Sequence, residues 1–384
     1  METAIVVIAY NRHNSLKRLL NSIGKADYPK GVQIPLIISI DRSDNNLVKR
    51  VADDFQWIHG EKKVVLHEKN LGLKAHVLSC GEYVLTYGSA IILEDDLAVA
   101  PSFYYFAKSA LKFCENKDHI AGISLYNHKL NVHVREPFSA IEDGYDNYYF
   151  QFAQSWGQAF SASQWQSFMD WNELHKEEAV LADNVPPNVS SWSDKSWLKY
   201  HIKYVIDTNR FFLYPTLSLT TNFSDTGTHA TRSVNDLQVE LAGHYREGKQ
   251  YLFSELQETN AVYDAYFENM VLRSQLAAKL GVEEKSVVID LYGYKGKPEK
   301  GYYLCAQSLP YRIVRSYRRA LRPMDANVFR GIEGEELFLY DLSKEGEAPK
   351  TEAAGKYLYH YKALKVKALK SVLTFRVKEK FRHQ

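Results

Sequence analysis

Short apolar runs alternate with longer amphipathic stretches over the first hundred residues. The apolar runs have the composition of strands, whereas the stretches between them space apolar side chains three and four positions apart, as at Leu16, Leu19 and Leu20. Such spacing is typical of helices. Strands are predicted at 4–9, 35–40, 63–67 and 90–93, and helices at 14–23, 47–55 and 72–86. Strand and helix alternating at this pace predict βαβ units and a mostly parallel sheet, that is, an α/β fold.

Polar residues follow several of these predicted strands. Arg12 comes after the first, Asp41 after the second, Asn70 after the third and Glu94 after the fourth. Right-handed crossovers place the carboxyl ends of parallel strands at one edge of the sheet, where open α/β sheets bind their ligands. We therefore expect a nucleotide site at this edge.

The fourth strand ends in three consecutive carboxylates, Glu94, Asp95 and Asp96, which we call the acidic triplet. Adjacent anions repel one another, so a fold that keeps them together usually supplies a cation. Hard oxygen ligands suit Mg²⁺ or Mn²⁺, and these ions in turn suit a diphosphate. The alternative is an acidic turn that caps a helix beginning near Pro101, since carboxylates favour a helix N-terminus. The residues alone leave both interpretations open.

The other strand-end residues also have two interpretations each. Arg12 offers a planar fork of donors to a phosphate or base, or is a solvated arginine in a first helical turn. Asp41 accepts hydrogen bonds from a base or ribose, or forms an Asx-turn or helix cap, a role that Asp44 or Asn45 fills equally well. His76 stands alone in a predicted helix, where a histidine is more often structural than a ligand.

A further carboxylate, Asp194, lies between Trp192 and Trp197. An apolar environment raises the pKa of a carboxyl and suits it to act as a general base. The alternative is the N-cap of a helix over 195–206, for which Ser193 competes.

Composition narrows the function classes. The 45% hydrophobic and 24% charged residues are ordinary for a globular protein, and a net charge of +2 gives no reason to expect a nucleic-acid partner. Three widely spaced cysteines fit a reducing cytoplasm, and no apolar run approaches the ~20 residues that span a bilayer. No Gly-x-Gly-x-x-Gly follows the first strand and no Walker lysine is present, so the sequence lacks the fingerprints of dinucleotide-binding and P-loop proteins.

The chain is predicted to comprise a nucleotide-binding domain at 1–233, a smaller α+β module at 234–345 and a basic tail at 346–384. Residues 237–279 are interpreted as largely helical. Within the tail, residues 356–384 carry nine Lys or Arg against one acid, Glu379, together with apolar residues at helical spacing. This pattern indicates an amphipathic helix on the inner face of the cytoplasmic membrane or, alternatively, a helix packed on its own domain.

Several of these segments together resemble the GT-A glycosyltransferases, and most closely the inverting N-acetylglucosaminyltransferase I type. The matching segments are 7–12 (VIAYNR), 37–41 (IISID), 74–76 (KAH), 94–103 (EDDLAVAPSF) and 192–197 (WSDKSW). The opening residues also resemble the bacterial family-2 glycosyltransferases, which build surface polysaccharides. The last segment departs from the family, because it has one more residue between its tryptophans.

The resemblance implies a role for each site residue. Asp96 would coordinate Mn²⁺ or Mg²⁺ on the diphosphate of a UDP-sugar, and Asp194 would be the catalytic base. The implied donor contacts are Arg12 to phosphate, Asp41 to uracil, Glu94 and Asp95 to ribose and sugar hydroxyls, and His76. Residues 222–233 resemble a loop that closes over the donor. In that loop His229 is either an extra metal or phosphate contact or a solvated histidine.

The resemblance therefore implies an inverting, metal-dependent transferase that moves a sugar from a UDP-sugar, with UDP-N-acetylglucosamine favoured. The acceptor would be a hydroxyl of a glycan or lipid-linked saccharide, recognised through the smaller module. Two other classes stay open. A sugar-nucleotidyltransferase usually has a Gly-rich loop after the first strand, which residues 9–12 do not offer. The other is a carbohydrate-binding protein that retains the fold without catalysis.

Overall fold

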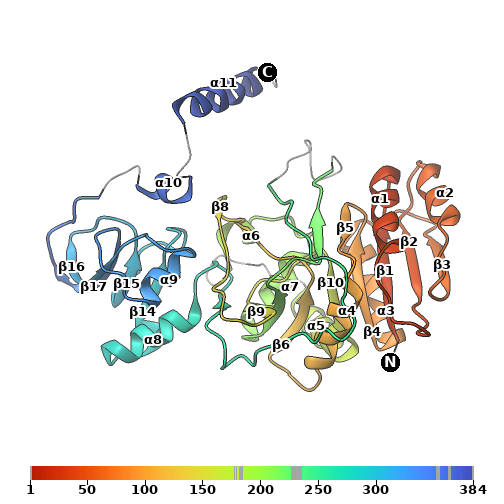
Figure 1. Cartoon of the computed structure of the whole chain (residues 1–384), viewed down its shortest axis with the longest axis horizontal. Helices are drawn as coiled ribbons and strands as arrows, with labels where there is room; N and C mark the ends of the chain where they lie inside the picture. The colour runs from red at the N-terminus through yellow and green to blue at the C-terminus, as the bar shows by residue number, and fades with distance from the viewer. Residues whose placement is uncertain are drawn as a thin grey trace. The chain divides into compact units, whose positions relative to one another are not determined.

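The computed structural model describes residues 2–176, 178, 180, 185–225, 236–351, 355–361 and 365–382. They form two compact units, Met1–Val271 and Leu272–Gln384, whose elements are labelled in Figure 1. A nine-stranded sheet forms the centre of the first unit and a four-stranded sheet that of the second.

The first unit is built on a nine-stranded sheet in the order β13-β9-β11-β6-β10-β4-β1-β2-β3. Strands β4, β1, β2 and β3 are parallel neighbours, and β10 runs antiparallel to both β4 and β6. The strands are β1 (Thr3–Ala9), β2 (Leu36–Ile40), β3 (Lys62–Leu66), β4 (Ser89–Glu94), β6 (Ile120–Ser124), β9 (Asn147–Phe150), β10 (Gln158–Ser161), β11 (Phe211–Pro215) and β13 (Val262–Tyr263). The predicted α/β fold with a mostly parallel sheet is confirmed.

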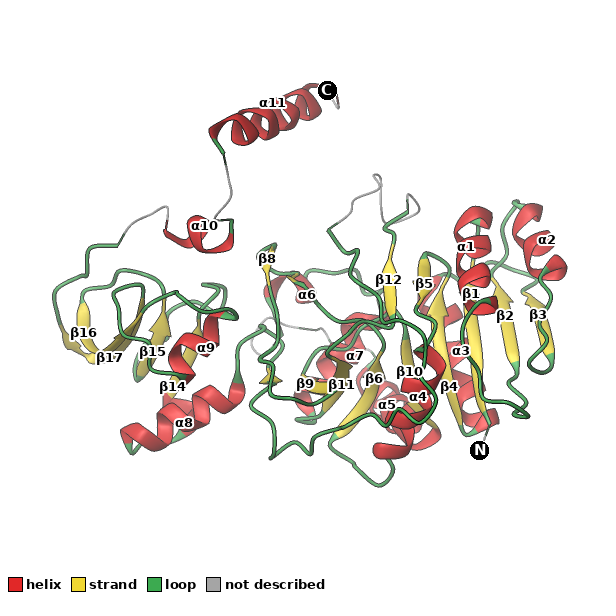
Figure 2. Ribbon diagram, viewed as in Figure 1, coloured by secondary structure: helices red, strands yellow, loops and turns green. Residues whose placement is uncertain are grey.

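Helices flank this sheet, as Figure 2 shows. They are α1 (His13–Gly24), α2 (Asn46–Asp54), α3 (Leu73–Tyr87), α4 (Phe103–Phe113), α5 (Ala162–His175), α6 (Pro187–Ser190) and α7 (Trp197–Asp207). Helix α1 buries Leu16, Leu19 and Leu20, the positions whose spacing predicts it. Every residue of β1 is buried, as expected for a parallel strand covered on both faces.

The acidic triplet begins at Glu94, the last residue of β4, and ends directly before a short strand, β5 (Leu97–Val99). Strand β5 pairs antiparallel with β12 (Thr220–Asn222), which brings Asn222 opposite Leu97. Helix α4 begins only at Phe103, after β5 and Pro101, and its first turn holds no acid. The helix-cap interpretation of the triplet is therefore wrong, because a strand separates the carboxylates from the helix.

The second unit contains a four-stranded sheet in the order β14-β15-β17-β16. Its strands are β14 (Val287–Asp290), β15 (Tyr302–Cys305), β16 (Tyr311–Tyr317) and β17 (Leu337–Glu345). Its helices are α8 (Met270–Leu280, of which the first two residues belong to the first unit), η1 (Glu284–Ser286), α9 (Met324–Phe329), α10 (Gly355–His360) and α11 (Val366–Arg382). The first unit also contains a hairpin of β7 (Leu130–Asn131) and β8 (Glu136–Pro137). In the described part of the chain, no helix is both long and apolar enough to cross a membrane.

The prediction of helix over 237–279 is largely wrong. Between 236 and 269 the described chain is mainly loop and turn, and helix begins at Met270. Apolar residues of this stretch, such as Tyr251, Phe253 and Leu256, pack against the main core. Their spacing reflects that packing and not a helical face.

One buried histidine of α7 lies in an apolar cage. His201 is fully buried, and its ring stacks on Phe168 with centroids 4.0 Å apart. Neither ring nitrogen has a hydrogen-bond partner among the described residues. Burial lowers the pKa of His201 to about 3.

We predict that His201 makes the fold sensitive to acid. An unfolded histidine takes up a proton below about pH 6.5, whereas folded His201 stays neutral down to about pH 3. The unfolded chain binds more protons in this window, so stability falls as the pH falls. From pH 7 to pH 5 this residue should remove about 2 kcal/mol from the free energy of unfolding. Urea titrations of wild type and His201→Leu at both pH values test this. An equal pH dependence of the two proteins would contradict it.

Candidate functional site

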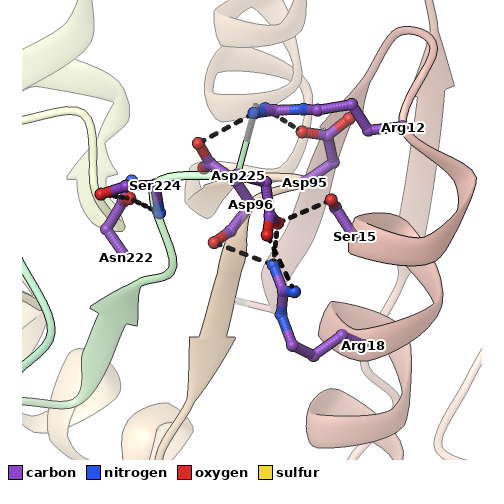
Figure 3. A network of polar contacts seen from close by, with 8 residues as sticks. All are labelled: Arg12, Ser15, Arg18, Asp95, Asp96, Asn222, Ser224 and Asp225. Carbon is purple, nitrogen blue, oxygen red and sulfur yellow. Dashed lines mark hydrogen bonds and ion pairs between the residues drawn. The ribbon is translucent and has the colours of Figure 1, made fainter. Parts of the chain in front are cut away.

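Arg12 supplies the cation that three adjacent carboxylates require. It is the residue before α1, and its guanidinium reaches across to the acidic triplet (Figure 3). One nitrogen donates to Asp96 Oδ2 at 3.1 Å and the other forms an ion pair with Asp95 Oδ1. The Asp95 side chain is only 4% exposed, so this pair is largely shielded from water.

The triplet remains electrostatically strained despite Arg12. Burial raises the pKa of Asp95 to about 6, with Asp96 adding to the effect and Arg12 opposing it. Burial and the charges of Asp96 and Asp95 raise the pKa of Glu94 well above its ordinary value, against the opposing effects of Arg12 and a hydrogen bond from Ser155. Raised carboxyl pKa values mean that the charged forms are unfavourable, so a further cation would stabilise the site.

Asp96 has the features of a metal ligand. Its Oδ1 atom is buried and has no hydrogen-bond partner among the described residues, whereas Oδ2 is held by Arg12. The described residues contain no cluster of three or more His, Cys, Asp or Glu placed to hold an ion by themselves. This donor set fits Mg²⁺ or Mn²⁺ bound through one or two carboxylates, with phosphates and water completing the coordination.

A second arginine, Arg18, contacts the triplet from the next turns of α1. It donates to the Asp96 carbonyl oxygen at 3.3 Å and forms an ion pair with Asp225 (Figure 3). Ser15 also donates to Asp225, with its hydroxyl 2.7 Å from Oδ2. Arg18 and Ser15 are absent from the sequence predictions, whereas Asp225 lies in the segment 222–233 that resembles a loop over the donor. The pairing of β12 with β5 brings the start of that segment to this edge.

Asp41 organises the turn that precedes α3. Its buried carboxylate accepts from the backbone N–H groups of Arg42 and Leu71 at 2.8 Å and of Gly72 at 3.0 Å. The cap of α2 is Asn45, whose side chain accepts from the Leu47 N–H. Asp41 is therefore not a helix cap, and its contact with uracil stays a prediction.

His76 lies inside the protein. It is 2% exposed, and its Nε2 is 2.8 Å from the hydroxyl of Ser39, which also contacts His67. Burial lowers the pKa of His76 to about 4. These contacts are those of a structural histidine, and the contact of His76 with the donor stays a prediction.

Asp194 lies in an exposed turn before α7. Its side chain is 82% exposed, so the apolar environment expected between the two tryptophans is wrong. The carboxylate accepts from the buried ammonium of Lys199 at 3.0 Å. Ser196 caps α7, whose first residue is Trp197, so the interpretation of Asp194 as a cap is wrong. Lys74 of α3 donates to the Asp194 carbonyl at 3.4 Å. Because Asp41 holds the residues just before α3, this contact ties the Asp194 turn to the edge that carries Asp41.

Ser155, in the segment before β10, also contacts the triplet, and Gln154 holds the backbone there; neither residue is among the sequence predictions. Gln154 accepts from the backbone N–H groups of Ser155 at 2.6 Å and Trp156 at 3.0 Å, and Ser155 contacts Glu94. Nothing in the residue pattern distinguishes this glutamine from a surface residue. The predicted contact His229 lies outside the described residues.

Comparisons with known proteins agree with the sequence resemblance. Residues 1–171, a little under half of the chain, match the GNT-I family model. The matched segment includes Arg12, Asp41, His76 and the acidic triplet but not Asp194. No curated protein matches the sequence. The resemblance to a GT-A glycosyltransferase of the GNT-I type is thus confirmed for the N-terminal part of the chain.

Several solved glycosyltransferase structures are similar at low identity. TarS 1-349 from S. aureus in complex with UDP-GlcNAc is 14% identical, with 60% of each chain covered and a TM-score of 0.39. The mannosyltransferase PcManGT from Pyrobaculum calidifontis, in complex with GDP-Man and Mn²⁺, is 13% identical over 55% of this chain and 54% of its own, with a TM-score of 0.33. Mouse xyloside xylosyltransferase 1 is 10% identical over 55% and 84%, at 0.36.

Proposed function

We propose that this chain, which resembles the GNT-I family over residues 1–171, is an inverting, metal-dependent glycosyltransferase. It would transfer a sugar from a UDP-sugar, with UDP-N-acetylglucosamine favoured, to a hydroxyl of a glycan or lipid-linked saccharide. Synthesis of a bacterial surface polysaccharide is the role we favour. The observation that carries the proposal is the buried Oδ1 of Asp96, which lies after the carboxyl end of β4 beside Arg12 and has no hydrogen-bond partner among the residues that the structure describes.

The donor would bind along the edge formed by β1, β2 and β4. Asp96 would hold Mn²⁺ or Mg²⁺, which when bound neutralises the charge that builds on the departing diphosphate. Arg12 offers guanidinium donors to a phosphate, and Glu94 and Asp95 accept from ribose and sugar hydroxyls. Asp41 and His76 complete the proposed donor contacts, and His229 is a candidate extra contact.

Asp194 would take the proton from the acceptor hydroxyl as that oxygen attacks the anomeric carbon. One displacement without a covalent intermediate inverts the configuration. The exposure of Asp194 supports this role, because an acceptor must reach the carboxylate. Lys199, itself only 5% exposed, fixes the orientation of the carboxylate through its ammonium group.

Helix α11 supports contact with a membrane surface. Every described side chain in it is exposed, including Leu369, Val372 and Leu373, and basic residues surround them. Exposed apolar residues combined with excess positive charge suit an anionic lipid surface. We propose that residues 356–384 hold the enzyme peripherally at the inner face of the cytoplasmic membrane, near a lipid-linked acceptor.

We predict that Asp96→Asn abolishes metal-dependent chemistry. Wild type incubated with UDP-N-acetylglucosamine and Mn²⁺ should release UDP, slowly without acceptor, and the variant should be at least about 100-fold slower, because one carboxylate ligand is lost. A coupled UDP assay measures this, and Asp53→Asn on the exposed face of α2 is the control. Wild type that releases no UDP from any UDP-sugar would favour a carbohydrate-binding protein, and release of pyrophosphate from UTP and a sugar phosphate would favour a nucleotidyltransferase.

Asp194→Asn separates the base from the donor site. The variant should lose transfer by about 100-fold or more, as expected for a general base, while its affinity for UDP in the presence of Mn²⁺ stays within about twofold. Calorimetric titration of UDP and an assay of transfer to a saccharide acceptor give the two numbers. Lost UDP binding with a folded variant would contradict the assignment.

Replacing Lys367, Lys370 and Lys378 by Gln tests the membrane contact in the full chain. Each lysine near an anionic surface contributes about 1 kcal/mol, so the triple variant should bind phosphatidylglycerol vesicles about 100-fold more weakly. Co-sedimentation at low and high salt measures this. The matched control replaces the exposed Lys285, Lys300 and Lys350 and should bind like wild type. Equal binding of the two variants would exclude α11 as the anchor.

A further inference from the structure

Arg18 lies six residues after Arg12 and makes three contacts with one small region. Its guanidinium stacks on the ring of Phe223 at 3.9 Å, forms an ion pair with Asp225 and donates to the carbonyl oxygen of Asp96. About 29% of its side chain is exposed, so the pair with Asp225 is partly shielded. These contacts make Arg18 more than a solvated helix residue.

The segment that carries Asp225 is itself fixed against the acidic triplet. The N–H of Phe223 donates to the Asp96 carbonyl oxygen at 3.1 Å, continuing the pairing of β12 with β5. Ser224 has a φ of 50°, a left-handed conformation that is unfavourable for a residue other than glycine. Asn222 Oδ1 holds it there by accepting from the Ser224 N–H at 2.6 Å. This turn directs Asp225 towards α1, where Ser15 donates a hydrogen bond to its carboxylate and Arg18 forms an ion pair with it.

Asp96 is therefore held at two points. Its backbone carbonyl accepts from Arg18 and from the Phe223 N–H, and its Oδ2 accepts from Arg12. Of its polar side-chain atoms only Oδ1 has no partner among the described residues. The direction of this one free oxygen depends on the backbone that Arg18 and Phe223 hold.

We propose that Arg18 and Asp225 form a positioning pair that orients Asp96 for the metal while touching neither metal nor sugar. The inference rests on the proposed function, since it concerns the metal-binding atom of that site. It adds a residue pair that no motif indicates. The pair fixes the position of the Asp96 backbone, so its loss should change Mn²⁺ binding differently from the loss of a charge alone.

Charge and geometry predict opposite results for Arg18→Met. Removing a positive charge near a cation site favours the cation, so a purely electrostatic role predicts unchanged or stronger Mn²⁺ binding. A positioning role predicts weaker binding, because the carbonyl of Asp96 loses a donor and Asp225 loses its partner. Asp225→Asn weakens Mn²⁺ binding in both accounts. If the role is electrostatic, the double variant should bind Mn²⁺ more tightly than Asp225→Asn alone, because the two lost charges are opposite. If the role is positioning, the double variant and both single variants should bind about equally weakly, because each substitution breaks the same contact.

The experiment measures the Mn²⁺ concentration that half-saturates UDP binding, by calorimetry on the full chain. We expect about a tenfold increase for Arg18→Met, a similar increase for the double variant with Asp225→Asn, and a smaller one for Arg18→Lys. Lysine keeps the charge but lacks the planar fork and the stacking surface. Lys49→Met, which breaks the exposed pair with Asp53 on α2, is the control and should leave the value unchanged. Melting temperatures taken alongside confirm that each variant is folded.

Two results would overturn the inference and are distinguishable. Unchanged or stronger Mn²⁺ binding in folded Arg18→Met and Arg18→Lys would exclude a positioning role while leaving the proposed function intact. A wild-type protein whose UDP binding ignores Mn²⁺ would overturn the proposed function and the positioning pair together, because there would be no metal ligand to orient.

Discussion

Repulsion among three adjacent, largely buried carboxylates is the constraint on which the rest of this site depends. Anions at the end of a buried strand are unfavourable unless cations or donors meet them. Arg12 meets Asp95 and Asp96, and Ser155 meets Glu94, yet the pKa values of Asp95 and Glu94 remain raised. A divalent cation would relieve the repulsion that remains, and the bound cation would in turn attract an anionic diphosphate.

The sheet order brings the neutralising groups to the triplet. Parallel pairing of β1 with β4 places the start of α1, and hence both arginines, beside the end of β4. Antiparallel pairing of β5 with β12 returns residues 222–225 to the same place from more than a hundred positions away. The Asp41 turn and Lys74 extend this edge to Asp194. A single edge thus collects donors and acceptors from segments that are far apart in the sequence.

The sequence predicts well wherever residue type and period decide the structure. The sequence correctly predicts the buried face of α1, with Leu16, Leu19 and Leu20, and the position of the acidic triplet at the end of β4. Both follow from the spacing of apolar residues within a single helix or strand. Long-range pairing is not encoded in this way. The contact of Arg18 with Asp225 spans 207 positions and requires the pairing of β12 with β5. The apolar residues of 236–269 mislead, because they pack as loops on the core.

We propose that Asp96 binds a divalent ion that links the protein to a nucleotide diphosphate. Calorimetric titration of wild type with UDP, in Mn²⁺ and in excess EDTA, tests it most directly. Binding should be measurable in Mn²⁺ and weaken by about 100-fold or more in EDTA, because the cation that attracts the diphosphate is removed. Equal affinity under the two conditions would contradict it.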